Sequence, residues 1–121
     1  MATTTTIGGS EIRLSLPDSL MLRYEVSHLL VSNFQRGICA ALGICWRGTG
    51  RPKVSFAQCQ HNMAVYGGHV FDELMSRGIE YEEILSAGGE AIKLIHGGLV
   101  SSSEVEEVEN FTEAEPVRAT G

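Results

Sequence analysis

The most apolar run of the chain, from Ser32 to Gly48, limits the possible folds more than any other stretch. Its apolar residues recur at steps of three and four, the spacing that places side chains on one face of an α-helix: Phe34, Ile38, Ala41, Leu42 and Cys45. Ile44 and Trp46 lie off this stripe, and a helix that is apolar on more than one side is usually buried between neighbours. The run therefore predicts the central helix of a small bundle, with Ser32 as its N-cap.

A second helix is predicted immediately before the central one, over about 20–31. Its apolar stripe consists of Leu22, Val26, Leu29 and Leu30. Either Asp18 or Ser19 is expected to cap it. Because only Ser32–Asn33 separates the two helices, we expect a sharp turn or an antiparallel helical hairpin between them.

Two later segments also have helical periodicity. One begins after Asn62, a suitable N-cap, and the other covers 80–96 and ends at Gly97–Gly98. Each contains a Gly-Gly pair, at 67–68 and 88–89, which we interpret as a packing or hinge site. Six side chains from three of the predicted helices are expected to be largely buried: Leu42, Trp46, Val70, Leu74, Ile92 and Ile95.

The N-terminal region is predicted to contain a disordered segment followed by one short strand. Residues 1–10 are mostly Thr, Gly and Ser, a composition typical of disorder. Residues 11–16 alternate between apolar and polar side chains, which predicts a short half-buried strand. No other clearly alternating run follows it, so we expect this strand to pair with a second copy of the chain, giving a homo-oligomer.

The C-terminal segment, 101–121, has a different composition. It carries six Glu against Arg118, a net charge of −5, whereas 21–57 carry five basic side chains against Glu25, a net charge of +4. A short helix with an apolar edge surrounded by carboxylates would suit a basic or amphipathic partner, and it predicts these partner-binding residues: Val105, Val108, Phe111, Glu104, Glu106 and Glu107. The alternative is a solvated tail without a function.

Together these patterns predict a mainly α fold. We expect a small helical bundle of about four helices, with a short N-terminal β-strand and an acidic C-terminal tail. The predicted organisation is a disordered N-terminus over 1–10, a helical domain over 11–100 and a partly disordered acidic tail over 101–121. A length of 121 residues is typical of one domain.

Composition excludes several classes of protein. The net charge of −6 argues against general nucleic-acid binding. No apolar run reaches the roughly 18–20 residues that span a bilayer, so we expect no membrane association. The N-terminus MATTTTIGGS lacks the basic and hydrophobic regions of a signal peptide, and three Cys is an odd number for a disulfide framework, which together favour a reduced cytosolic compartment.

No arrangement of residues predicts catalysis or a bound cofactor. Cys39, Cys45, Cys59 and His61 are the set closest to a metal site, but their spacing does not match the paired ligands of structural zinc sites, so we expect free thiols and no metal. His69 lies near Asp72 and Glu73, yet no nucleophile is suitably spaced for such a base. The basic loop Gly48–Lys53 lacks the spacing of a phosphate loop. We therefore expect a protein that is not an enzyme.

Two segments resemble a family of small bacteriophage and prophage proteins encoded among tail genes, the tail assembly chaperones. The first is a helix that ends in ALGICWRG, and the second, after a Pro-containing loop, is AVYGGHVFDELMSRGIEYEEILSAGGEAIKLI. The resemblance covers residues 20 to about 100, roughly two-thirds of the chain. These motifs are structural rather than catalytic, so no family binding residue is assigned to a position of this chain.

The resemblance implies a non-enzymatic chaperone or adaptor in the host cytoplasm. Proteins of this family coat the long, aggregation-prone tape-measure protein and help to recruit tail-tube subunits. The alternative function is a structural virion component, such as a connector or tail completion subunit, which would oligomerise through its N-terminal strand. Presence in finished particles, or only during assembly, distinguishes the two.

Overall fold

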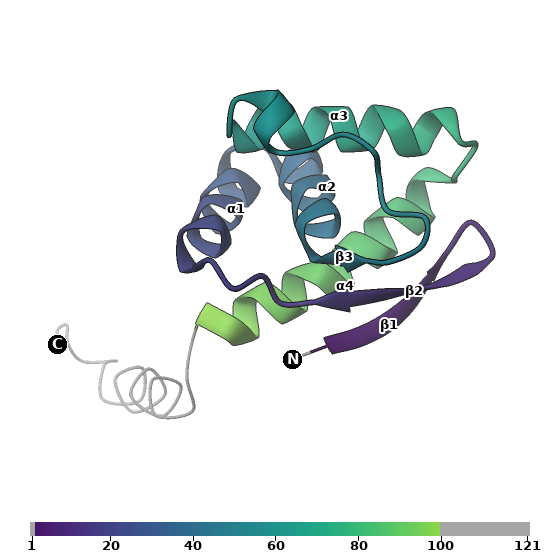
Figure 1. Cartoon of the computed structure of the whole chain (residues 1–121), viewed down its shortest axis with the longest axis horizontal. Coiled ribbons are helices and arrows are strands. Elements are labelled where there is room, and N and C mark those ends of the chain that lie inside the picture. Colours follow the sequence, from purple (N-terminus) through teal and green to yellow (C-terminus); the bar gives the residue numbers. More distant parts are fainter. Residues whose placement is uncertain (1, 100–121) are drawn as a thin grey trace, which may run out of the picture.

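The computed structural model describes residues 2–99, and these residues form a mainly helical fold with a small antiparallel sheet (Figure 1). The elements follow one another in the order β1 (Ala2–Ile7), β2 (Ser10–Ser15), α1 (Leu20–Ser32), α2 (Phe34–Cys45), β3 (Trp46–Arg47), η1 (Ala57–Cys59), α3 (Met63–Ser76) and α4 (Tyr81–Leu99). The mainly α fold with four helices and an N-terminal strand region is confirmed. The predicted acidic tail over 101–121 lies outside the described residues.

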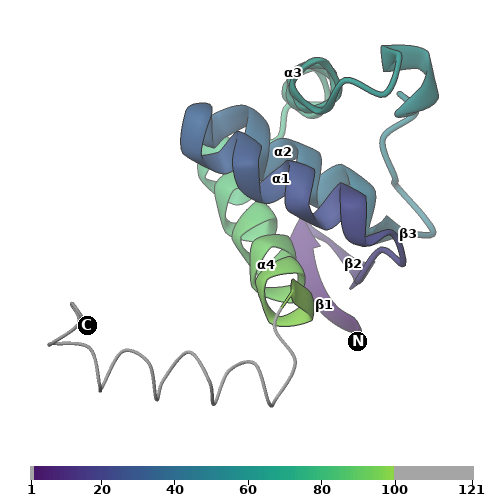
Figure 2. The ribbon, with the colours of Figure 1, turned by 90° about the vertical axis from the view of Figure 1, so that its left-hand side faces the viewer.

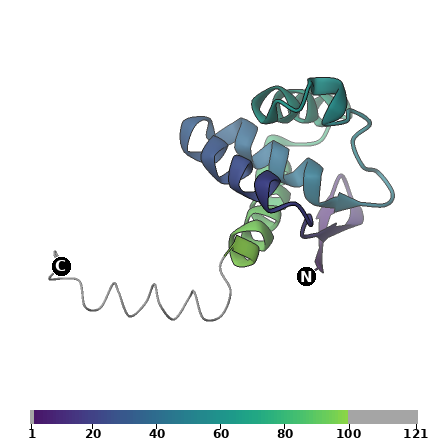
Figure 3. The same cartoon turned by 60° about the vertical axis from the view of Figure 1, so that its left-hand side comes forward.

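Helix α2 is the centre of the fold, as its apolar sequence predicts. It packs against α1, α3 and α4, and every residue from Gly37 to Cys45 is buried. Its N-cap is Asn33 and not the predicted Ser32, because the Asn33 side-chain oxygen accepts a hydrogen bond from the Arg36 N–H at 3.2 Å. Asn33 alone separates α1 from α2, so the predicted sharp turn is present (Figure 3).

Local capping signals placed two other helix starts correctly. The Ser19 hydroxyl accepts from Leu22 N–H at 3.2 Å, and the Asn62 side chain accepts from Val65 N–H at 3.1 Å. The predicted end of the last helix at Gly97–Gly98 is wrong, because α4 continues to Leu99. A long-range contact accompanies this extension, since the Arg23 guanidinium donates to the Gly98 carbonyl oxygen at 3.1 Å.

The glycine pairs mark close helix crossings. A Cβ added at Gly67 would overlap the carbonyl oxygen of Arg36, and one added at Gly88 would overlap the Ile38 side chain and lie 3.0 Å from the Ile38 carbonyl oxygen. Gly89, in contrast, has no heavy atom within 4 Å of such a Cβ. One glycine of each pair therefore lets α3 or α4 approach the α2 backbone, which makes both pairs packing sites.

The N-terminal region forms a β-hairpin. β1 pairs with β2 in antiparallel register from Ala2↔Ser15 to Ile7↔Ser10, and Gly8 and Gly9 turn the chain with φ of 59° and 82°. The prediction of disorder is therefore wrong for residues 2–7. Thr is a good strand former, and a run of identical Thr residues hides the alternation that pairing imposes: Thr3 and Thr5 are half-buried, Thr4 and Thr6 are exposed.

The predicted lack of a local partner for strand 11–16 is also wrong. β2 is the middle strand of the sheet, with β1 on one edge and β3 on the other, where Leu14 pairs with Trp46. Its predicted facing is confirmed, since Ile12 and Leu14 are buried and Arg13 is exposed. Because β2 is paired on both edges, the premise for self-association through 11–16 fails.

The core lies between the helices and the inner face of the sheet. Five of the six side chains that were expected to be buried are so: Leu42, Trp46, Val70, Leu74 and Ile95. Ile92 is partly buried and packs against the same core. Over residues 2–99, no helix combines the length and the apolarity needed to cross a membrane.

Candidate interaction surface

Within residues 2–99, four of the eight large apolar side chains that are exposed lie on the outer face of α1. The inner face packs Val26 and Leu29 into the core. The outer face nevertheless carries Leu20, Met21, Tyr24 and Val31, which are 50%, 68%, 49% and 90% exposed. Leu20, Tyr24 and Val31 recur at helical spacing, so they lie on one side of the helix.

Phe34, the first residue of α2, extends this apolar area past the turn at Asn33 and is 61% exposed. We call Leu20, Met21, Tyr24, Val31 and Phe34 together the α1 surface. Figure 2 shows α1 in front of α2, with no described element drawn over its outer side. Single exposed apolar residues are normal, but five on one helix and its adjoining turn make this surface a candidate for binding.

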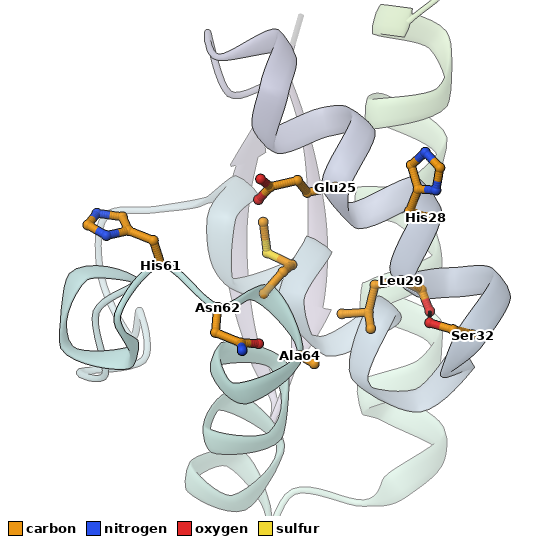
Figure 4. Close-up of a pocket in the computed structure, with 8 residues that line it drawn as sticks. Glu25, His28, Leu29, Ser32, His61, Asn62 and Ala64 are labelled. Carbon is orange, nitrogen blue, oxygen red and sulfur yellow. Dashed lines mark hydrogen bonds between the residues drawn. The ribbon is translucent and has the colours of Figure 1, made fainter.

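A hollow of about 510 Å³ borders the α1 surface (Figure 4). Helix α1 forms one wall, and the segment that leads into α3 forms the other. The eight residues that line it are Glu25, His28, Leu29, Ser32, His61, Asn62, Met63 and Ala64. Met21 lies on the same helical stripe as Glu25 and His28, so the hollow and the α1 surface are continuous along α1.

The wall opposite α1 has an unusual backbone. Gln60 and His61 both adopt left-handed conformations, with φ of 55° and 57°, which cost non-glycine residues free energy. Hydrogen bonds from Gln60 N–H to Ala57 O and from His61 N–H to Phe56 O, both 3.0 Å, hold this turn. The Phe56 ring also meets the His61 ring edge-on at 5.2 Å. The sequence carries no glycine or proline signal for this turn, so sequence reasoning missed it.

The partner-binding residues that the sequence predicted lie outside the described residues. Val105, Val108, Phe111, Glu104, Glu106 and Glu107 all belong to 101–121, and their role stays a prediction. Sequence reasoning missed the α1 surface, because it assigned α1 a single apolar stripe facing the core.

The four residues considered above as a possible metal site do not form one cluster in the structure. Cys39, Cys45 and Cys59 are buried free thiols, whereas His61 is exposed at the hollow. Among residues 2–99, no three His, Cys, Asp or Glu side chains are grouped so as to hold a metal ion. Burial raises the pKa of Cys39 and of Cys45 to about 12, although the nearby Arg47 charge opposes the shift at Cys45.

These two thiols are expected to be chemically inert in the folded protein. At pH 8, a pKa near 12 leaves roughly one thiolate in ten thousand, and the thiolate is the reactive form. Titration with a chromogenic disulfide reagent should therefore detect at most Cys59 rapidly in native buffer, and all three cysteines in denaturant. Rapid reaction of two or more thiols in the native protein would contradict this burial.

The structure separates Glu73 from His69 and Asp72, the residues considered above as a base–carboxylate set. His69 and Asp72 line a small hollow of about 150 Å³ beside Arg36. Glu73 faces the loop before η1 instead: its carboxylate accepts hydrogen bonds from the backbone N–H groups of Lys53 and Val54 at 2.7 and 3.2 Å. It also pairs with Arg77 at 2.8 Å. Glu73 therefore anchors a loop to α3 rather than activating a base.

The Glu73 contacts predict a pH-dependent contribution to stability. Partial burial raises the pKa of Glu73. The hydrogen bonds from Lys53 N–H, Arg77 and Val54 N–H together lower this pKa by more than burial raises it, so the pKa of Glu73 lies below its usual 4.5. A lowered folded-state pKa gives stability that is present above the unfolded pKa and is lost as pH falls through the folded one. Glu73→Gln should reduce the free energy of unfolding by about 1–2 kcal/mol at pH 7 and by much less at pH 3.

Denaturant unfolding at both pH values measures this difference. Glu90→Gln is the matched control, because the Glu90–Lys93 pair is exposed and long, at 3.4 Å, and such pairs contribute little. Equal losses for Glu73→Gln at pH 3 and pH 7 would show that the charge of Glu73 is not what holds the loop.

Arginine side chains in and around the basic loop donate hydrogen bonds to backbone carbonyl oxygens. Arg47 donates to Ile44 O at 2.8 Å, and Arg51 donates to Trp46 O at 3.0 Å, which satisfies carbonyls at the end of α2. Arg77 donates to Gly50 O at 2.6 Å. Within the loop, the Arg51 side chain therefore contacts the end of α2, and the Gly50 carbonyl oxygen ties the loop to Arg77.

Comparisons with protein-family models, with curated proteins and with solved structures find no match for this chain.

Proposed function

We propose that this protein is a non-enzymatic bacteriophage tail assembly chaperone or adaptor. It would bind the tape-measure protein and tail-tube subunits in the host cytoplasm. The observation that carries the proposal is the α1 surface, a set of exposed apolar side chains on a helix whose other face is buried. The resemblance of residues 20–100 to tail assembly chaperones supports the choice of partner.

The shape of the surface favours a helical partner. An amphipathic helix binds by placing its apolar stripe against an apolar helix face or groove. Leu20, Tyr24 and Val31 offer such a face, and the hollow beside them provides space for larger side chains. Glu25 at the edge of the hollow would favour a partner helix that carries basic residues next to its apolar stripe.

The chemistry of the interior supports a binding role over a catalytic one. Burial raises the pKa of Cys39 and of Cys45 to about 12, so these two thiols are protonated at neutral pH, and the Glu73 carboxylate is committed to a loop and to Arg77. The α1 surface, in contrast, is not covered by any element within residues 2–99, and an apolar surface left in water lowers solubility.

A structural virion component remains the second candidate, and β1 is the observation that favours it. β1 is an edge strand of the sheet, so within residues 2–99 only one side of its backbone pairs with another strand. Oligomerisation through the N-terminal region would therefore use residues 2–7, not 11–16. Immunodetection in purified particles separates the two functions, because a chaperone is absent from them and a virion component is present.

Polar substitutions on the α1 surface are expected to weaken chaperone action. The triple variant Met21→Gln/Tyr24→Gln/Val31→Gln keeps a good helix former at each position. A loss of about 1.4 kcal/mol in binding would weaken its affinity for the tape-measure protein tenfold. Co-expressed with the tape-measure protein of the same phage or prophage, it should therefore leave a smaller fraction of that protein soluble than the native chain does.

A second variant controls for the loss of exposed apolar area. Met75→Gln/Tyr81→Gln changes two exposed apolar residues, at the end of α3 and the start of α4, which line neither the α1 surface nor the hollow beside it, and should leave solubilisation intact. Circular dichroism checks that both variants fold. Equal solubilisation by the native chain and both variants would refute the α1 surface as the binding site.

A further inference from the structure

We propose that the acidic segment 103–111 of the same chain docks on the α1 surface when no partner is bound. Val105, Val108 and Phe111 would then cover part of the exposed apolar face of α1. The segment acts as a tethered competitor that the partner must displace. This inference rests on the proposed function for its biological role, but the docking itself is independent of the partner.

The exit point of the tail carries the argument. The described chain ends at Leu99, and the Gly98 carbonyl oxygen accepts a hydrogen bond from Arg23, in the first turn of α1, at 3.1 Å. Figures 1 and 3 place the end of α4 beside the start of α1. The tail therefore leaves the fold next to Leu20 and Met21, the first residues of the α1 surface.

The length of the tail fits this surface. Residues 100–104 bridge at most roughly 18 Å when fully extended. The residues of the α1 surface that belong to α1 itself run from Leu20 to Val31, about 16 Å along the helix. The linker is therefore long enough for Val105 to lie against these residues. Tethering gives the segment an effective concentration on the order of millimolar, so a weak apolar contact is sufficient to keep it bound.

Charge favours the segment only at the start of α1, where the first turn has no acidic residue and both Arg23 and the positive end of the helix dipole attract carboxylates. Glu25, further along α1, opposes the charge of the segment at the hollow, so apolar contacts supply the binding there. Tyr81, in contrast, is flanked by Glu80, Glu82 and Glu83, which repel a segment rich in Glu. Tyr81 also lies at the opposite end of α4, about 27 Å along the helix from Leu99.

Methionine methyl NMR on the full chain tests the docking. The chain has four methionines, and two of them report on exposed apolar sites: Met21 is 68% exposed on the α1 surface and Met75 is 43% exposed on α3. Met63 is buried and reports on the fold. The spectrum of the native chain is compared with that of the full-length variant Val105→Gln/Val108→Gln/Phe111→Gln. Met21→Gln assigns the Met21 signal.

In the tail variant, the Met21 methyl signal is expected to shift, and the Met75 and Met63 signals are expected to stay unchanged. The same differences should be seen at every protein concentration. An unchanged Met21 signal would overturn the proposal. A Met21 difference that vanishes on dilution would also overturn it, because a second copy would then be the source of the segment.

Affinity for the partner tests whether the docked segment competes with it. With the tape-measure protein as the probe, the same tail variant should bind about tenfold more tightly than the native chain, since a competing contact worth about 1.4 kcal/mol is removed. Unchanged or weaker binding would refute competition even where docking is observed. Failure of the proposed function is seen separately, as solubilisation that does not depend on the α1 surface when the tail is intact.

Discussion

Replacing Gly67 by alanine is expected to lower the free energy of unfolding by about 3 kcal/mol. The added Cβ would overlap the carbonyl oxygen of Arg36 and lie 2.9 Å from its carbonyl carbon, and all of these atoms belong to the backbone of α2. Backbone atoms cannot rotate away as a side chain does, so α3 must move off α2. Because α2 is the helix on which the other three pack, this shift disturbs the whole core.

The neighbouring glycine supplies the control. A Cβ at Gly68 would meet only the end of the Arg36 side chain, at 3.4 Å from Nε, and this flexible group can move. Gly68→Ala should therefore be neutral or stabilise the protein by up to about 1 kcal/mol, through helix propensity. Urea unfolding of both variants gives the comparison. A Gly67→Ala variant within about 0.5 kcal/mol of the native chain would refute the close crossing of α2 and α3.

Replacing Trp46 by alanine is expected to cost about 3–5 kcal/mol. Trp46 is 1% exposed, it pairs with Leu14 in the sheet, and its indole N–H donates to Thr49 O at 3.1 Å. The substitution therefore opens a cavity at the junction of α2 and the sheet and leaves a hydrogen-bond acceptor without its donor. Denaturant unfolding followed by circular dichroism measures the loss.

Phe34→Ala is the matched control for Trp46→Ala. Both are large aromatic residues at the ends of α2, but Phe34 is 61% exposed and Trp46 is buried. Its removal should change stability by less than about 0.5 kcal/mol. Similar losses for the two variants would show that Phe34 is packed as Trp46 is, and that the α1 surface is smaller than described.

Helix positions were predictable because their signals are local. Ser19 and Asn62 cap the next turn of the chain, and α2 carries its apolar period within its own sequence. The end of α4 was not predictable in this way, because Gly97–Gly98 is a typical helix stop. There the Arg23 contact to Gly98, which joins residues 75 apart, accompanies the continued helix.

The hairpin and the α1 surface were missed for tertiary reasons. A run of Thr shows no alternation by itself, and only pairing with β2 determines which Thr side chains face outward. Similarly, the periodicity of α1 predicts the face that packs on the core, but the sequence does not show whether another element covers the apolar residues of the opposite face. The positions of α2 and α4 determine that Val26 is buried and that Val31 is 90% exposed.

Site-specific photo-cross-linking tests the central claim, that the α1 surface binds the partner, most directly. A photoreactive amino acid replaces Val31, the most exposed apolar residue of that surface, or Met75 as the control on α3. Each full-length variant is irradiated with the tape-measure protein bound. We predict a cross-linked product from position 31 and none from position 75. A product from position 75 without one from position 31 would contradict the claim.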